Sequence, residues 1–147
     1  MWFKRMIASA LSAVLLCTGL GMTASAETIS TYSFAGSVSP LYEIAASAYS
    51  ELIITGTTAE CKSKASGDNT AKITVVQTLE KYSGWFWIWN EVDGASWTKN
   101  ANSDYINFVN TKSGLASGKY RLKSVFTLTD NNGKTETITV YSDEKSV

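Results

Sequence analysis

Apolar or small residues alternate with polar ones in several short stretches of the chain, which predicts β-strands. In residues 59–66, small residues in the phase of Cys61 alternate with charged or polar residues. A period of two residues places one phase on a core and the other in water. Similar alternation occurs over about residues 72–81, 120–129 and 135–141, where β-branched residues suit a pleated surface.

Turn-forming residues separate these stretches. The sequence Asp-Asn-Asn-Gly at residues 130–133 joins two alternating runs, and its glycine can supply the positive φ of a tight hairpin. Asp93-Gly94 predicts a similar turn, and residues 66–69 and 113–114 predict longer loops. Short strands at this spacing predict an all-β antiparallel sandwich or barrel.

The segment GWFWIWNEVDGASW, residues 84–97, places tryptophans at every second position. If it is a strand, Trp85, Trp87 and Trp89 share one face at a spacing of about 6.6–6.8 Å. Such a row could stack on the rings of a polysaccharide, or it could fill a sandwich core, where Trp is buried on average. In either case one face of the segment stays exposed, and exposed apolar patches mark contact sites.

The candidate ligand-binding face therefore consists of four aromatic side chains. They are Tyr82, Trp85, Trp87 and Trp89.

The N-terminus has the order of a secretory signal peptide. Lys4 and Arg5 precede an apolar run from residue 6 to about residue 22, which predicts a helix, and small residues Ala24 and Ala26 mark a cleavage site. We expect cleavage after Ala26 and a secreted, extracellular product. An uncleaved membrane anchor is the alternative, although the run is short for a span.

The chain after the leader divides into two parts. Residues 27–44 form a polar lead-in rich in Ser and Thr, and residues 45–147 form one domain. The stretch 40–50 fits either a helix opened by Pro40 or a strand from about Ser47, and β-branched residues that follow favour the strand.

Composition removes several kinds of chemistry. The chain has 13 basic and 13 acidic residues, so loss of Lys4 and Arg5 with the leader leaves a net charge of −2. That charge argues against nucleic acid as a partner. The chain has no second apolar run of spanning length, so we expect no membrane association after the leader is removed. The absence of histidine removes the usual nucleophile activation and the commonest metal ligand. We therefore predict no catalytic residues, no metal and no cofactor. A carboxylate pair, Glu91 and Asp93, leaves a weak glycoside hydrolase open.

Cys61 is the single cysteine that remains after the leader, because Cys17 lies within it. One cysteine cannot form an intramolecular disulfide. Its phase predicts a buried thiol that packs as a small hydrophobe, and a bridge to another chain is the alternative.

Residues 118–120 (Gly-Lys-Tyr) resemble a feature of immunoglobulin-like sandwiches. In these domains a Tyr near the start of the sixth strand bonds back to the backbone a few residues upstream. The resemblance implies a structural role for Tyr120, and it places Leu122 and Cys61 where antibody domains carry a disulfide. It therefore implies an antiparallel sandwich of about seven strands.

The chain also resembles small uncharacterised secreted proteins of Gram-positive bacteria with a single immunoglobulin-like domain. The residues that carry this resemblance are Ala59-Glu60-Cys61, residues 77–81, Trp97, residues 118–122 and residues 134–138. The resemblance implies a fold and no established activity. We expect a secreted, non-catalytic binding or adhesion domain for a polysaccharide or an extracellular protein. Weak self-association as a structural or adhesion protein is the first alternative.

Overall fold

A computed structural model describes residues 28–29 and 42–147, and these residues form nine strands and no helix. The predicted signal peptide, its Ala24 and Ala26, and most of the polar lead-in lie outside the described residues. The strands are β1 (Thr28–Ile29), β2 (Ala45–Thr55), β3 (Thr58–Gly67), β4 (Thr70–Ser83), β5 (Ile88–Ala101), β6 (Tyr105–Lys112), β7 (Lys119–Asp130), β8 (Thr135–Tyr141) and β9 (Lys145–Ser146).

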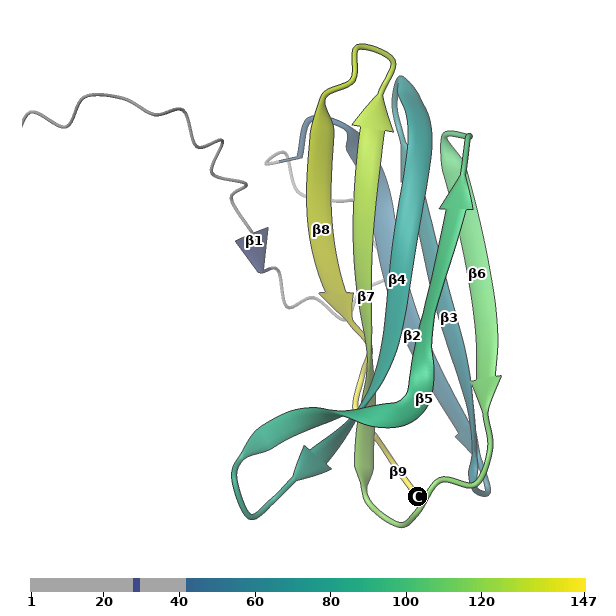
Figure 1. Cartoon of the computed structure of the whole chain (residues 1–147), viewed down its shortest axis with the longest axis vertical. Coiled ribbons are helices and arrows are strands. Elements are labelled where there is room, and N and C mark those ends of the chain that lie inside the picture. The colour runs from purple at the N-terminus through teal and green to yellow at the C-terminus, as the bar shows by residue number, and fades with distance from the viewer. Residues whose placement is uncertain (1–27, 30–41) are drawn as a thin grey trace, which may run out of the picture.

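The strands form two sheets that pack face to face (Figure 1). One sheet has the order β1-β8-β7-β4-β5, with β9 also pairing with β7, and the other has the order β2-β3-β6. All pairs are antiparallel except β1 with β8. The prediction of an all-β sandwich is therefore confirmed.

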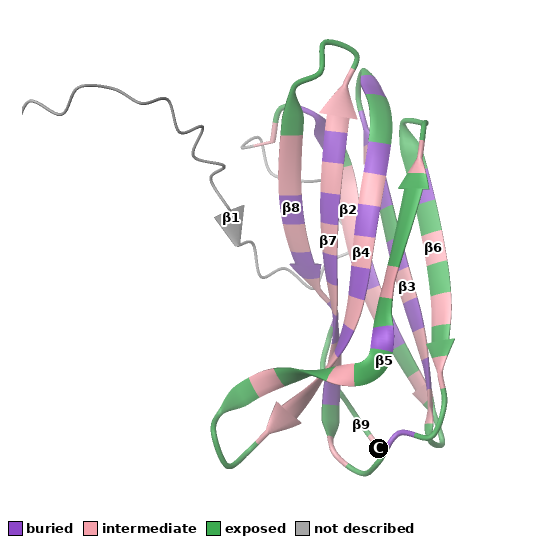
Figure 2. Ribbon diagram, in the orientation of Figure 1, coloured by how far each residue is buried: buried purple, intermediate pink, exposed green. Residues whose placement is uncertain are grey.

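Alternating burial marks the strands of the sandwich, as the bands of Figure 2 show. The phases predicted around Cys61 in β3 and along β4, β7 and β8 all face the core. The apolar core has two clusters, one around Phe126 and Ile73 and the other around Leu122 and Leu79. The ambiguous stretch is a strand from Ala45 onward, where β2 begins, and its residues 40 and 41 lie outside the described residues.

A hydrogen-bonded set of polar side chains lies in the core and was not predicted from the sequence. The hydroxyl of Ser124 lies 2.8 Å from that of Ser50 and 2.6 Å from that of Ser63. Gln77, which is fully buried, donates to Ser63 at 2.8 Å and accepts from Asn110 at 2.7 Å. Because each buried group has a partner, this set fixes the register of strands from both sheets without an unpaired polar atom.

Two of the four turn predictions need correction. The β7–β8 hairpin turns at residues 130–133 as expected, with Gly133 at φ 84°. The expected longer loop at residues 66–69 is instead a tight turn at Asp68-Asn69, with Asn69 at φ 54°. The expected hairpin turn at Asp93-Gly94 is wrong, because both residues lie inside β5.

Candidate functional site: an aromatic arm and the pocket beneath it

The chain reverses at residues 84–87, so the predicted row of three tryptophans on one strand is wrong. Trp85 and Trp87 lie in the turn between β4 and β5, and only Trp89 lies in a strand. Pairing of Ser83 with Ile88 leaves four residues for the reversal. The turn is closed by the amide of Trp87, which donates to the Ser83 carbonyl at 2.9 Å, and Trp87 adopts φ 58°.

The tip of this hairpin exposes both phases of the aromatic segment. The exposed fractions are 86% for Trp85, 68% for Phe86, 82% for Trp87 and 47% for Ile88. The expectation that at least one face is exposed is met, but neither phase enters the core. These four consecutive residues make the tip an exposed apolar patch, and such patches mark contact sites.

A bulge in β5 turns the hairpin away from the sandwich. Thr78 pairs with Ser96 and Glu80 pairs with Glu91, so four residues of β5 oppose the single residue Leu79. Gly94 within this bulge has φ 62°, which favours glycine. Figure 1 shows the resulting bend, beyond which residues 80–91 project beside the sandwich. We call residues 80–91 the arm.

An arginine on β7 holds the arm against the outer face of the larger sheet. The Arg121 guanidinium lies 4.3 Å from the ring centre of Trp89 and 4.1 Å from that of Tyr141. Its Nε also donates to the Glu80 carboxylate at 2.6 Å. Stacking between two aromatic rings and pairing with a carboxylate restrict both the guanidinium and the strand that carries Trp89.

The other two predicted ligand-binding residues lie together at the base of the arm tip. The rings of Tyr82 and Trp89 face each other across the hairpin, with centres 5.2 Å apart and planes inclined by 53°. Both side chains are half-buried. The four candidate residues therefore belong to one hairpin, but they divide into an exposed pair at the tip and a packed pair below it.

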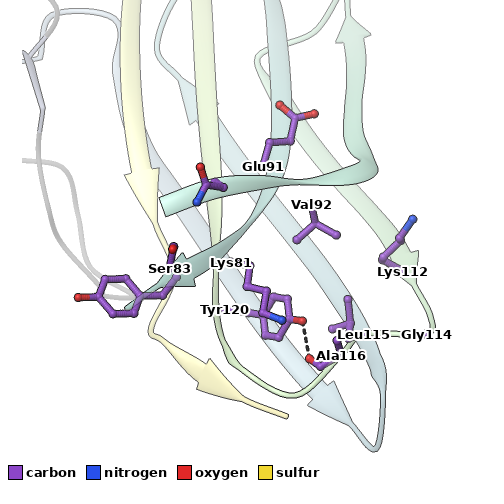
Figure 3. A pocket seen from close by; sticks show the side chains of 11 residues that line it. Lys81, Ser83, Glu91, Val92, Lys112, Gly114, Leu115, Ala116 and Tyr120 are labelled. Atoms are coloured by element: carbon purple, nitrogen blue, oxygen red, sulfur yellow. Dashed lines mark hydrogen bonds between the residues drawn. The ribbon is translucent and has the colours of Figure 1, made fainter. Parts of the chain in front are cut away.

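An open pocket of about 490 Å³ lies between the arm and the loop that connects β6 to β7 (Figure 3). Charged and polar side chains outnumber apolar ones in its lining. The lining residues are Lys81, Tyr82, Ser83, Asn90, Glu91, Val92, Lys112, Leu115, Ala116 and Tyr120, together with Gly114. A pocket of this size and mixed character can bury one sugar ring or a comparable polar group.

Tyr120 forms the floor of this pocket and fixes the adjacent loop. Its hydroxyl donates to the carbonyl of Ala116, four residues upstream, at 2.5 Å. The ring is 1% exposed, so the hydrogen bond satisfies an otherwise buried hydroxyl. The contact anticipated for this tyrosine is present, and it ties the loop of the pocket to β7.

Cys61 and Leu122 lie in the same core cluster, away from the arm tip. Both side chains are fully buried, and Cys61 is a free thiol. The expectation of a buried thiol is confirmed. Burial, with a smaller contribution from the Glu60 charge, raises the pKa of Cys61 to about 12, so the thiol stays protonated and unreactive at neutral pH.

Two kinds of site are not found in the part of the chain that the structure describes. No group of three or more carboxylate or thiol side chains is arranged to hold a metal ion. In the same residues, no helix has the length and apolar character that crossing a bilayer requires.

No protein-family model matches the sequence, and no curated protein matches it. The arrangement of the arm and the pocket is therefore the basis for a functional proposal.

Proposed function

We propose that the protein is a secreted, non-catalytic binding domain with an immunoglobulin-like sandwich, and that the arm binds an extracellular polysaccharide. The observation that carries the proposal is the pair of indoles at the tip, Trp85 and Trp87, each more than 80% exposed. Exposed indoles present flat apolar faces that suit the C–H faces of sugar rings, and they have little rotamer entropy to lose.

Three features support the immunoglobulin-like arrangement. Seven strands longer than two residues, β2 to β8, form the sandwich, and β7 is the sixth of them. Tyr120 near the start of β7 makes the backward hydrogen bond to Ala116. Cys61 on β3 and Leu122 on β7 share one core cluster, as the two halves of an inter-sheet bridge would.

The rigidity of the arm base supports a binding role for its tip. Arg121 stacks on Trp89 and pairs with Glu80, so the arm is held by contacts that do not use the indoles of the tip. A held loop loses less conformational entropy on binding than a mobile one. Side chains with hydroxyl-bonding groups, Ser83 and Asn90, line the pocket beside the tip and could orient a sugar.

The test uses protein exported from the full chain, purified from the medium and checked by mass spectrometry for cleavage after Ala26. Binding to cellulose, chitin, xylan and a Gram-positive cell-wall preparation is measured by depletion from solution. Trp85→Ala/Trp87→Ala should weaken binding to the recognised polymer by about tenfold or more. The matched control, Ile53→Ala/Val109→Ala, removes exposed apolar side chains from the smaller sheet and should bind normally.

Self-association is the second candidate function, because the same tip exposes Phe86 and Ile88 as well as two indoles. Sedimentation over a range of protein concentrations separates the two candidates. A monomer that binds polysaccharide supports the first. If the protein self-associates, binds none of the four polymers and no longer associates after Trp85→Ala/Trp87→Ala, self-association replaces polysaccharide binding as the function. Sugar release that Glu91→Gln abolishes would support a hydrolase instead.

A further inference from the structure

Two lysines that form no ion pair among the described residues, Lys81 and Lys112, line the pocket beneath the arm. The Nζ atom of Lys81 lies 5.5 Å from the centre of the Tyr120 ring. The Nζ atom of Lys112 donates to the main-chain carbonyl of Asp93 at 2.7 Å.

The third charged residue of the pocket does not neutralise them. Glu91 lies opposite Glu80 in the β4–β5 register, and therefore belongs to the outer phase of the arm. Figure 3 shows its carboxylate on the other side of the β5 ribbon from Val92, Lys81 and Tyr120. On the side of the β5 ribbon that Tyr120 and Val92 occupy, the charged lining residues are therefore the two lysines, although the whole chain has equal numbers of basic and acidic residues.

The lysine stems are also held in place by the fold. A Cβ atom at Gly118 would lie only 2.5 Å from Cε of Lys81, so the stem of this lysine packs directly over the glycine. The position of Lys112 is fixed by its hydrogen bond to the bulge of β5. Two ammonium groups that are held by neutral partners keep donors available for a ligand.

We propose that this pocket receives an anionic group, a carboxylate or a phosphate, carried by the polymer that the arm tip contacts. The inference rests on the proposed function: the indoles supply apolar contact, and the lysines select charge. An anionic oxygen accepts stronger hydrogen bonds from ammonium groups than a neutral hydroxyl does. Tyr120, Leu115 and Val92 add apolar lining beside the lysines, which lowers the local dielectric and strengthens this interaction.

The experiment compares three soluble polymers by isothermal titration calorimetry. They are a neutral β-linked glucose oligomer, an oligogalacturonate that carries carboxylates, and a poly(glycerol phosphate). The pocket variant is Lys81→Met/Lys112→Met, because Met keeps an unbranched stem over Gly118. The control variant, Lys64→Met/Lys72→Met, makes the same change in net charge at residues outside the pocket. Equal melting temperatures of the two variants verify that both are folded.

We expect one of the two anionic polymers to bind about tenfold more tightly than the neutral oligomer, and which one binds identifies the source of the anion. The pocket variant should lose this difference, and the control variant should keep it. Added salt should weaken binding of the anionic polymer more than binding of the neutral oligomer. Equal binding of all three polymers, binding of no anionic polymer, or an equal loss in both variants would overturn the inference.

The Trp85→Ala/Trp87→Ala protein keeps the two proposals separable. If this protein no longer binds any of the polymers while the lysine variants bind normally, the arm proposal holds and the charge inference fails. If it binds the anionic polymer normally while the pocket variant does not, the pocket is the binding site and the arm proposal fails.

Discussion

The two halves of β5 have similar burial but different neighbours, although they belong to one strand. The half from Ser96 to Ala101 pairs with β4 inside the sandwich, where Trp97 packs half-buried against a core cluster. The half from Ile88 to Glu91 pairs with β4 in the arm, beyond the bulge, where Trp89 packs against Tyr82 and Arg121 and Asn90 lines the pocket. Trp89 and Trp97 are both half-buried, so the two halves differ in what covers the indole: a core cluster of the sandwich packs against Trp97, whereas Tyr82 and Arg121 of its own sheet pack against Trp89.

The largest expected difference between the two regions is in stability. Phe126→Ala should lower the free energy of unfolding by about 3–5 kcal/mol, because it leaves a cavity in a fully buried site. Trp87→Ala removes a large aromatic side chain from the arm tip. This change should alter the free energy of unfolding by less than about 0.5 kcal/mol. Urea denaturation of both variants measures the difference. A loss of several kcal/mol of stability in Trp87→Ala would mean that the tip is buried, which would contradict the structure.

Stability at high pH should depend on Cys61. The pKa of the buried thiol is raised from 9.0 to about 12, so its contribution is fully present below pH 9 and is lost as the pH rises toward 12. Relative to Cys61→Ala, the wild type should lose about 1.4 kcal/mol per pH unit over this window. Denaturation curves from pH 8 to 11 measure the difference between the two proteins. Parallel curves for both proteins would indicate an exposed thiol, and so would rapid labelling of the native thiol at pH 8.

The polar set in the core should be sensitive to loss of one member. Gln77→Leu removes the hydrogen bonds that the amide makes with Ser63, Asn110 and the Phe108 carbonyl, which should lower the free energy of unfolding by about 1–3 kcal/mol. Thr78 is the neighbour of Gln77, on the outer face of β4. Thr78→Val should change the free energy of unfolding by no more than about 0.5 kcal/mol. Urea denaturation of both variants provides the comparison. A gain in stability from Gln77→Leu would show that burial of the amide is a net cost to the fold.

The smallest expected effect concerns how the arm is held. Arg121→Met removes two ring contacts and the pairing with Glu80, so amides of the arm should exchange hydrogen up to about tenfold faster. Amides of the sandwich should be unaffected, and Lys123→Met on the same face of β7 serves as the control. Unchanged protection of the arm in Arg121→Met would mean that strand pairing alone holds it.

Sequence alternation predicted most of the sandwich because its strands have one wet face and one buried face. The buried phases around Cys61, Ile73 and Leu122 were visible for this reason. Alternation failed at residues 85–89, where every residue is apolar or aromatic, because burial there depends on a bulge opposite Leu79 that changes the direction of the strand. Gly94 was recognised as a residue suited to positive φ, but a hairpin turn and a bulge use glycine in the same way.

The contacts around the arm were also beyond the sequence. Trp89 was a candidate from the aromatic pattern, but Arg121, which stacks on it, comes from β7, and the stacking depends on the β4–β7 register. The lysine pair of the pocket comes from β4 and β6, which belong to different sheets. Contacts of this kind follow from tertiary arrangement and leave no local pattern.

Tryptophan fluorescence of the exported protein carrying Trp89→Phe and Trp97→Phe tests the central claim most directly, because Trp85 and Trp87 are then its only indoles once the leader is removed. The account predicts red-shifted emission that acrylamide quenches efficiently, and protection from the quencher when the recognised polysaccharide is added. Blue-shifted emission that resists acrylamide at every protein concentration, or quenching that no polymer changes, would contradict it.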